Sequence, residues 1–446
     1  MMREPAFTLL PRPQRVALAG KRVLVLGLGD TGLSVARWVQ QQGGTARVAD
    51  TRPEPPRKRD YHGELRSGPF SPELLDAVDL VCISPGLPLS EPVILEAVRS
   101  KIPVLGDVEL FAWENRSKVL AITGTNGKTT VTALTGHLLR AAGVDCEVAG
   151  NIGPAVLDAS MKRRAAPAVW VLELSSYQLE TTWSLAPHAA AVLNLTEDHL
   201  DRYAGLEDYA AAKARVFQGD GAQILNCDDP RVLAMALPGR TTVTFGVSAE
   251  ADFGIREGKL VRGDEAIIEA AALPIRGWHN AANALAACAL ASTVKVSLEA
   301  LATGLKTFKG LPHRLELVRT HRRVEWYDDS KGTNVGATIA ALKGLAKRTV
   351  LILGGEGKGQ DFSPLAPVVA QFAAHVLLIG RDAPIIEKVI PGERCGSLEE
   401  AVQRAARLAR PGDAVLLSPA CASFDMFRDY KHRGEVFAAA VRGLPA

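Results

Sequence analysis

Several features that would mark a particular class of protein are missing from this 446-residue sequence. Its six cysteines are scattered, with no C-x-x-C pair and no histidine at zinc-site spacing, which favours a reduced, cytoplasmic protein. No run of about 18 apolar residues occurs, and Pro11 and Pro13 interrupt the N-terminal segment, so we expect neither a transmembrane helix nor a signal peptide. A net charge of +3 is too small for a general attraction to nucleic acid.

The composition supplies material for more than one hydrophobic core. Hydrophobic residues make up 47% of the chain and charged residues 23%, as in soluble globular proteins. A domain usually has about 100 to 200 residues, so the length predicts two to four domains, and we expect three.

One local pattern, an apolar strand that runs into a polar or glycine-rich turn and then a helix, begins three times, at residues 21–28, 118–123 and 324–328. Continuous apolar runs of this kind are typical of parallel strands covered on both faces. A helix is expected at 335–345, whereas 248–270, rich in charge and glycine, is interpreted as a surface hairpin or loop insertion. The pattern predicts three α/β domains, over residues 1–106, 107–311 and 312–446.

The first turn, Gly27 to Gly32, matches G-x-G-x-x-G, and Asp50 ends the strand that follows it. In a dinucleotide site such glycines let the backbone approach a pyrophosphate, while the acid binds ribose hydroxyls. Three interpretations stay open from these residues alone: an NAD site, a site for the diphosphate of a UDP-sugar, and a tight turn without a ligand.

The second turn predicts an ATP site. Backbone amides of such a loop point at phosphate oxygens, the amine of Lys128 reaches the terminal phosphates, and the hydroxyl of Thr129 can reach Mg²⁺. Ile122 occupies the place of the first glycine of the strict Walker pattern, but the strand before the loop is the required context. The residues expected to bind ATP here are Gly124, Thr125, Asn126, Gly127, Lys128, Thr129 and Thr130.

Acids and a histidine downstream could hold a metal, namely Glu173 and the pair Asp198-His199. Glu173 follows an apolar strand, at the sheet edge where α/β proteins bind ligands, and His199 lies in an acidic segment. Taken singly, Glu173 would more often form a buried ion pair and His199 would more often be an ordinary histidine. The ATP loop changes this balance, because ATP chemistry requires Mg²⁺ and hard oxygen ligands. Lys213, in a helical segment, is most simply a surface lysine.

Polar loops of the C-terminal third should meet at one edge of its sheet. Three of them, at 329–334, 354–362 and 418–425, follow predicted strands, and His313 and Arg314 precede the first. Ser, Thr, Lys and Asp converging on one edge favour a site for carboxylates or phosphates. The alternative for Asp329 is a cap on the helix at 335–345.

Taken in order, six motifs resemble the Mur ligases along the whole chain, most closely the members that add D-glutamate. They lie at residues 27–34, 50–52, 173–180, 196–203, 329–334 and 418–423. The resemblance implies a Rossmann-like UDP-binding domain, a central P-loop ATPase-like domain and a C-terminal Rossmann-like domain. It also implies an ADP-forming ligase of peptidoglycan synthesis, and hence of cell-wall growth and division, that joins D-glutamate to UDP-N-acetylmuramoyl-L-alanine through an acyl phosphate.

Site residues carried over from this resemblance fall into four groups. The catalytic group is Lys128, Glu173, His199, Lys213 and Lys331. The nucleotide group adds Asn280, Asn283, His313, Arg314 and Asp329 to the ATP loop. The UDP-substrate group is Asp30, Thr31, Asp50, Thr51, Arg52, Asn151 and His199. The D-glutamate group is Thr333, Lys358, Ser423 and Tyr430, the last in place of the family's usual phenylalanine.

Two Mg²⁺ sites are implied as well, one held by Thr129 and Glu173, the other by His199 and an N-carbamoylated Lys213. We expect a monomer that neither enters membranes nor binds nucleic acid. Other Mur ligases are the nearest rivals, but the diamino-acid motif D-N-P-R is missing. Folylpolyglutamate synthetase lacks the UDP domain, and a non-catalytic NAD-sensing protein would leave Lys128, Glu173 and His199 unexplained.

Overall fold

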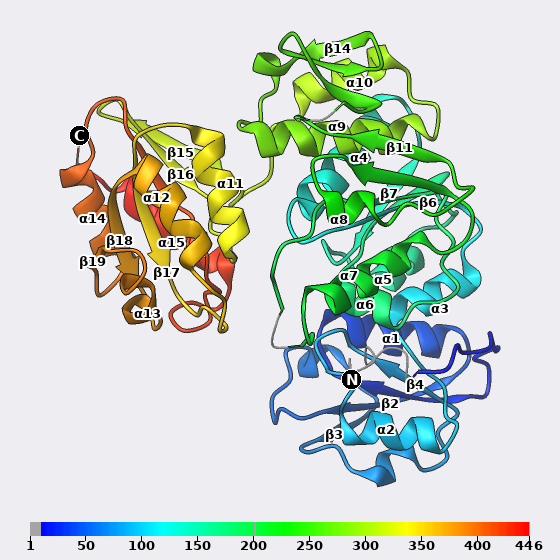
Figure 1. The fold of residues 1–446 in the computed structure, drawn as a ribbon. Helices are drawn as coiled ribbons and strands as arrows, with labels where there is room; N and C mark the ends of the chain where they lie inside the picture. Colours follow the sequence, from blue (N-terminus) through cyan, green and yellow to red (C-terminus); the bar gives the residue numbers. More distant parts are fainter. Residues whose placement is uncertain (1–9, 200–201, 249, 446) are drawn as a thin grey trace.

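The structure is a computed structural model that describes residues 10–199, 202–248 and 250–445. Its strands form three separate sheets flanked by helices, so the predicted organisation into three α/β domains is confirmed (Figure 1). In this view the C-terminal domain lies beside the central domain, and the N-terminal domain lies below the central one. Among the described residues, no helix is long and apolar enough to cross a membrane.

The N-terminal sheet is parallel, with strand order β3-β2-β1-β4-β5. Alternate residues of β1 enter different hydrophobic clusters, Val23 and Val25 on one face and Leu24 and Leu26 on the other, which explains its continuous apolar run. Because β1 lies between β2 and β4, the strand order reverses there, and open α/β sheets bind ligands at such a point. The elements are β1 (Arg22–Leu26), α1 (Asp30–Gln41), β2 (Thr45–Asp50), β3 (Glu64–Ser67), β4 (Leu80–Ile83), α2 (Pro92–Arg99) and β5 (Val104–Leu105).

The central sheet has nine strands, in the order β14-β13-β12-β11-β10-β9-β6-β8-β7, and reverses at β6. Its strands are β6 (Lys118–Thr123), β7 (Cys146–Gly150), β8 (Val169–Glu173), β9 (Ala189–Val192), β10 (Ala222–Asn226), β11 (Thr242–Phe245), β12 (Phe253–Arg256), β13 (Lys259–Arg262) and β14 (Glu265–Glu269). Its helices are α3 (Asp107–Glu114), α4 (Lys128–Ala141), α5 (Val156–Lys162), α6 (Ser176–Glu180), α7 (Leu206–Ala214), α8 (Pro230–Leu233), α9 (Trp278–Ser292) and α10 (Leu298–Thr307).

Of the two interpretations of 248–270, the hairpin is confirmed and the loop insertion is wrong. Strands β12, β13 and β14 pair antiparallel and extend the central sheet, and they bury Phe253, Leu260 and Ile268. Each strand has only four or five residues, too few for an alternating pattern to stand out among the charged neighbours.

The C-terminal sheet has the order β15-β16-β20-β17-β18-β19, with only β15 antiparallel to its neighbour. The predicted helix at 335–345 is α11, and Asn334, whose Oδ1 accepts from the Ala337 amide, is its N-cap, so Asp329 is not. The elements are β15 (Glu316–His321), β16 (Val324–Asp328), α11 (Val335–Leu345), β17 (Thr349–Gly354), α12 (Ala366–Phe372), β18 (Ala373–Ile379), α13 (Ala383–Glu387), β19 (Glu393–Arg394), α14 (Leu398–Leu408), β20 (Ala414–Leu417) and α15 (Tyr430–Arg442).

Candidate active site

A cavity of about 430 Å³ lies at the switch point of the N-terminal sheet, between the loops after β1 and β4. The turn that forms its floor requires glycine. Gly27 has a φ of +89°, and a Cβ on Gly32 would lie 1.8 Å from the Gly27 carbonyl oxygen. Of the residues expected to bind UDP, all but His199 line this cavity, namely Asp30, Thr31, Asp50, Thr51, Arg52 and Asn151.

Asp50 ties this turn to the end of β2. Its Oδ2 accepts from the Leu28 amide (2.7 Å) and from Arg52 Nη2 (2.7 Å), and its Oδ1 accepts from Arg52 Nε (2.8 Å). Burial alone would raise the pKa of Asp50, but the hydrogen bonds from Arg52 and Leu28 outweigh it and lower the pKa to about 2. The carboxylate therefore stays ionised and holds the turn in shape.

The loop at 124–130 closes around its own lysine. Lys128 Nζ donates to the carbonyl oxygens of Gly124 and Thr125, both at 2.8 Å. Asn194, two residues after β9, accepts from the Asn126 amide (2.8 Å) and donates to its carbonyl (3.1 Å). We had given Asn194 no role, although a polar residue at the carboxyl end of a central strand is a usable signal.

Lys213 is buried and not on the surface, which corrects the simplest interpretation of that residue. Only 1% of it is exposed, its Nζ donates to the Gly124 carbonyl (2.9 Å), and the ammonium lies 4.3 Å from the centre of the Tyr209 ring. Burial, and next to it the charge of Lys128, holds the pKa of Lys213 well below its usual value. Burial lowers the pKa of Lys128 too. Two amines thus share one carbonyl oxygen at the ATP-type loop.

Glu173, the last residue of β8, offers an oxygen for a cation. Its Oε1 accepts from Asn151 Nδ2 (2.7 Å), whereas its buried Oε2 has no hydrogen-bond partner among the residues that the structure describes. Thr129 lies in the first turn of α4, after the loop. Carboxylate and hydroxyl oxygens are ligands that Mg²⁺ prefers, so the chemistry of these two side chains fits a metal site.

The imidazole of His199 is held by Tyr177, another residue to which we had assigned no role. The Tyr177 hydroxyl lies 2.7 Å from His199 Nδ1, and His199 Nε2 lies 3.8 Å from Asp198 Oδ2. A hydrogen bond at one ring nitrogen fixes the direction of the other, as in metal-binding histidines.

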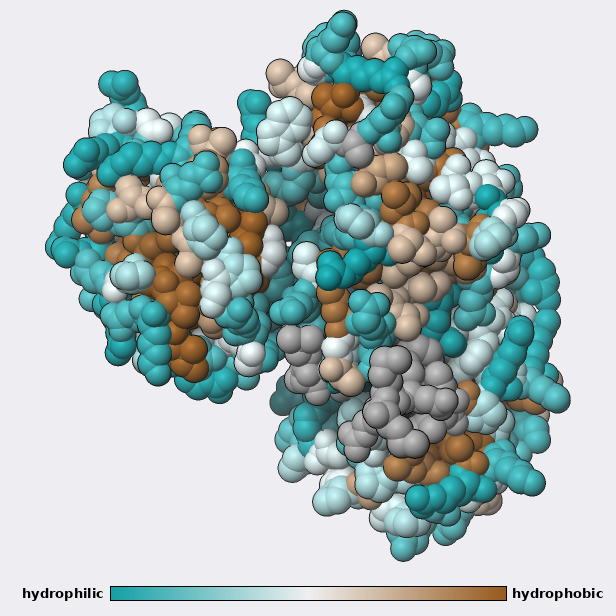
Figure 2. All heavy atoms as spheres, viewed as in Figure 1, coloured by the Kyte–Doolittle hydropathy of each residue, from teal (hydrophilic) through white to brown (hydrophobic). Residues whose placement is uncertain are grey.

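A second cavity, of about 360 Å³, lies between the central and C-terminal domains, and the surface is hollowed between these two bodies (Figure 2). Asn280 and Asn283, in the first turns of α9, line it together with Arg314 and Asp329. Gly127 has no room for a side chain, since a Cβ would lie 2.4 Å from Asn283 Oδ1. The cavity therefore joins the ATP-type loop to the C-terminal domain.

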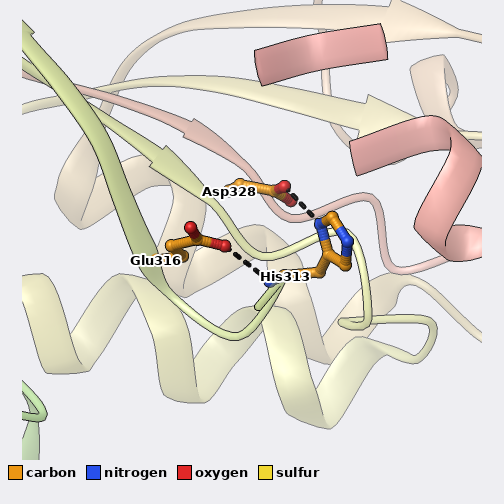
Figure 3. A group of neighbouring side chains, drawn as sticks. All are labelled: His313, Glu316 and Asp328. Atoms are coloured by element: carbon orange, nitrogen blue, oxygen red, sulfur yellow. Dashed lines mark hydrogen bonds and ion pairs between the residues drawn. The ribbon is translucent and has the colours of Figure 1, made fainter. Parts of the chain in front are cut away.

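His313, Glu316 and Asp328 form a hydrogen-bonded group at the start of β15 and the end of β16 (Figure 3). His313 Nδ1 lies 2.7 Å from Asp328 Oδ2, and the His313 amide donates to Glu316 Oε2 (2.9 Å). The bond to Asp328 raises the pKa of His313. Their possible ligand atoms lie within 4.8 Å of one another, but Nδ1 and Oδ2 are already paired. The group stabilises the segment next to Arg314, and His313 does not line the cavity of about 360 Å³.

Lys331 lies where the cavities meet. It lines the cavity of about 360 Å³ and a third one of about 790 Å³ that Asn151 and Tyr430 also line. Burial, followed by the charge of Arg314, lowers the pKa of Lys331 to about 8, and its ammonium lies 4.1 Å from the Tyr430 ring centre. Burial raises the pKa of Asp329 to about 7, although the Ser418 hydroxyl donates to it at 2.7 Å.

The remaining residues predicted for D-glutamate come from three loops at the carboxyl edge of the C-terminal sheet. Thr333 follows β16, Lys358 follows β17 and is exposed, and the buried Ser423 follows β20. Gln360, which we had not singled out, ties these loops together. It accepts from the Val335 amide (3.0 Å) and donates to the carbonyls of Gly357 (3.1 Å) and Ala420 (2.7 Å).

Asn334 links this domain to the central one. Its Nδ2 donates to Asn126 Oδ1 (3.1 Å) in the ATP-type loop and to Asp198 Oδ2 (3.2 Å) beside His199. Only the packing of two domains brings these side chains together, so no local pattern could have predicted the contact.

Three family models match successive parts of the chain: the Mur ligase MurD-like N-terminal domain over residues 21–106, the Mur ligase middle domain over 122–291 and the Mur ligase glutamate ligase domain over 313–421. Among solved structures, the UDP-N-acetylmuramate-alanine ligase MurC from Thermotoga maritima has the same fold. It is 18% identical, with a TM-score of 0.62 over 94% of this chain and 99% of that one.

Curated relatives are much more similar in sequence. The UDP-N-acetylmuramoylalanine--D-glutamate ligase of Nitrosospira multiformis is 54% identical, over 96% of this chain and 97% of that protein. The ligase of the same name from Thiobacillus denitrificans is 53% identical, over 96% and 98%. With three family models that match successive parts of the chain and this identity over nearly the whole length, the chain belongs to the Mur ligase family.

Proposed function

We propose that this chain is an ATP-dependent ligase that adds D-glutamate to UDP-N-acetylmuramoyl-L-alanine in the synthesis of peptidoglycan precursors. The names of the relatives at 54% and 53% identity support this substrate pair. The observation that carries the proposal is the position of Glu173. Its carboxylate is bonded to Asn151, which lines the N-terminal cavity, and its negative charge acts on Lys128 of the ATP-type loop. A UDP-substrate held in the N-terminal cavity would thus present its free end to the ATP-type loop.

The reaction would run in two steps between the cavities. The substrate carboxylate attacks the γ-phosphorus of ATP, the bond from that phosphorus to the ADP oxygen breaks, and an acyl phosphate forms. The amine of D-glutamate then attacks the acyl carbon, phosphate leaves and the amine loses a proton. Lys128, Arg314 and Lys331 would offset the repulsion between these anions, and the loop amides would hold the phosphates in line.

Thr129 and Glu173 would hold one Mg²⁺, for which the unpartnered Glu173 Oε2 is the evidence, and His199 and Lys213 would hold another. A bound Mg²⁺ would neutralise phosphate charge. An ammonium is no metal ligand, so we propose that Lys213 is carbamoylated. Its buried amine, when neutral, attacks CO₂, a nitrogen–carbon bond forms and a proton is released, which turns the side chain into a carboxylate analogue. All six cysteines are free, which supports a cytoplasmic enzyme.

Thr333, Lys358, Ser423 and Tyr430 would receive D-glutamate. One cation and two hydroxyls suit two carboxylates on a short side chain. With both carboxylates fixed, inversion at the α-carbon would swing the amine away from the acyl phosphate, so we expect L-glutamate to be rejected.

The test is phosphate release from ATP with UDP-N-acetylmuramoyl-L-alanine and a panel of amino acids. We expect turnover with D-glutamate and background rates with L-glutamate, L-alanine and diamino acids. Comparable rates with L-glutamate would contradict the assignment of these loops, and turnover only with a diamino acid would contradict the proposed substrate.

A further inference from the structure

Arg202 crosses from the central domain to the wall of the N-terminal cavity. It lies in the loop between β9 and α7, yet its Nη1 donates to the carbonyl oxygens of Leu87 (2.9 Å) and Pro85 (3.2 Å). Pro85 and Leu87 belong to the turn after β4 and line the cavity of about 430 Å³. None of the roles proposed above uses Arg202.

The guanidinium of Arg202 is fixed on its other sides. Its Nη2 donates to Glu180 Oε2 at 2.6 Å, with 12% of the arginine side chain and 4% of the glutamate side chain exposed. Glu180 Oε1 accepts from the Tyr203 hydroxyl (2.6 Å), and the guanidinium lies 4.0 Å from the centre of the Tyr177 ring. A planar group held by an ion pair and a ring loses little freedom when it also bonds two carbonyls.

Through these contacts Arg202 is connected both to the N-terminal cavity and to the loop that carries His199. On one side, the Ser84 hydroxyl of the same turn donates to the Gly27 carbonyl (3.1 Å), so the β4 turn and the glycine turn support each other. On the other side, Tyr177, over which Arg202 lies, holds His199. The arginine is therefore a single rigid connection between the N-terminal cavity and the His199 loop.

We propose that Arg202 is a positioning residue for the nucleotide end of the UDP-substrate: it sets the position of the turn at Ser84–Leu87 from the neighbouring domain and so sets the affinity for UDP. This rests on the function proposed above. Arg202 itself does not line the cavity, so it acts through the backbone carbonyls that it holds. A cavity wall fixed before binding reduces the ordering that a ligand must impose.

The experiment compares Arg202→Lys with Arg215→Lys in the full-length protein. Arg215 is a matched control, because its guanidinium also bonds two backbone carbonyls, those of Leu179 and Thr182 (both 2.7 Å), and lies 5.4 Å from the Trp183 ring centre, but within the central domain. Lysine keeps a positive charge in both places and loses the fork of donors. The dissociation constants of UDP and of ADP are measured by calorimetry, with melting temperature as a check on folding.

We expect Arg202→Lys to weaken UDP binding about tenfold, as the loss of one net charged hydrogen bond does, and to leave ADP binding unchanged. Arg215→Lys should leave both constants unchanged. Equal UDP affinities in the two variants, whether both weaken or neither does, would overturn the proposal, as would an equal loss of ADP affinity in Arg202→Lys. Failure of the wild-type chain to bind UDP would contradict the proposed function itself, and would be evident before any variant is measured.

Discussion

The turns at Gly27 and Gly124 are both strand-to-helix turns at the switch point of a sheet, between parallel strands, yet their electrostatics differ. Around Gly27 the fixed charge is the Asp50 carboxylate, whose partner Arg52 is half exposed. Around Gly124 two buried amines, those of Lys128 and Lys213, donate to one carbonyl oxygen. The first turn can recognise a ligand by shape and hydrogen bonds. The second brings two buried amines to one place before any ligand arrives, where burial and the charge of Lys128 lower the pKa of Lys213.

The largest expected effect comes from removing the charge at the second turn. Lys128→Ala should lower ATP turnover by about 1000-fold, because its amine would hold the transferred phosphate. UDP binding, measured by calorimetry, should stay unchanged because the first turn lies in another domain. Lys118→Ala, an exposed lysine at the start of β6, is the control and should behave as wild type. Near-normal ligation by Lys128→Ala would contradict the assignment of ATP to the second turn and of UDP to the first.

Lys213→Ala should lower turnover by about 100-fold, the scale of losing a metal-supporting group. Added acetate should restore part of it, because a small carboxylate can occupy the vacated position. The carbamate should also be visible as a new carbonyl signal in the NMR spectrum of wild-type protein equilibrated with isotope-labelled bicarbonate. Full activity of the variant, or no such signal, would leave Lys213 as a plain buried amine.

At the first turn, shape should matter more than charge. Gly32→Ala should destabilise the N-terminal domain by about 3 kcal/mol and weaken UDP binding, because the new methyl group must displace the Gly27 carbonyl. Gly29→Ala is a matched control in the same turn, since a Cβ there meets nothing within 4 Å. Melting temperatures of the two variants provide the measurement, and equal values would show that the turn is not as tight as described.

The smallest effect concerns the buried carboxylate of Asp50 at the first turn. Asp50 has a folded pKa of about 2 against an ordinary value of 3.8, so its stabilisation is complete above about pH 4 and is lost as the pH falls towards 2. Asp50→Asn should therefore lower the stability of the protein at pH 7 by at most about 2 kcal/mol. The gap in melting temperature between wild type and variant should narrow from pH 5 to pH 3. A constant difference in melting temperature from pH 5 to pH 3 would show that the charge of Asp50 does not stabilise the turn.

Much of the architecture followed from local patterns. The strand predicted at 324–328 and the helix at 335–345 match β16 and α11 residue for residue, because apolar runs and a capping residue act over a few neighbours. For residues 248–270 the sequence left a surface hairpin and a loop insertion open, since it does not show that β12 pairs with β11 and so extends the central sheet. Only the family resemblance assigned Asp30 and Asn151 to one ligand. The fold brings both residues to one cavity.

By itself, the sequence determined the three α/β units, the two glycine turns and the chemistry of the residues at their strand ends, because these depend on periodicity and on the residue types that a turn accepts. Only the tertiary structure decided that Lys213 is buried beside Gly124, that Glu173 keeps one oxygen without a described partner, and that Arg202 and Asn334 reach into neighbouring domains. Contacts between domains join residues that are up to 208 positions apart in the sequence. A local sequence pattern does not show which distant side chains will bury a charged group and so shift its pKa.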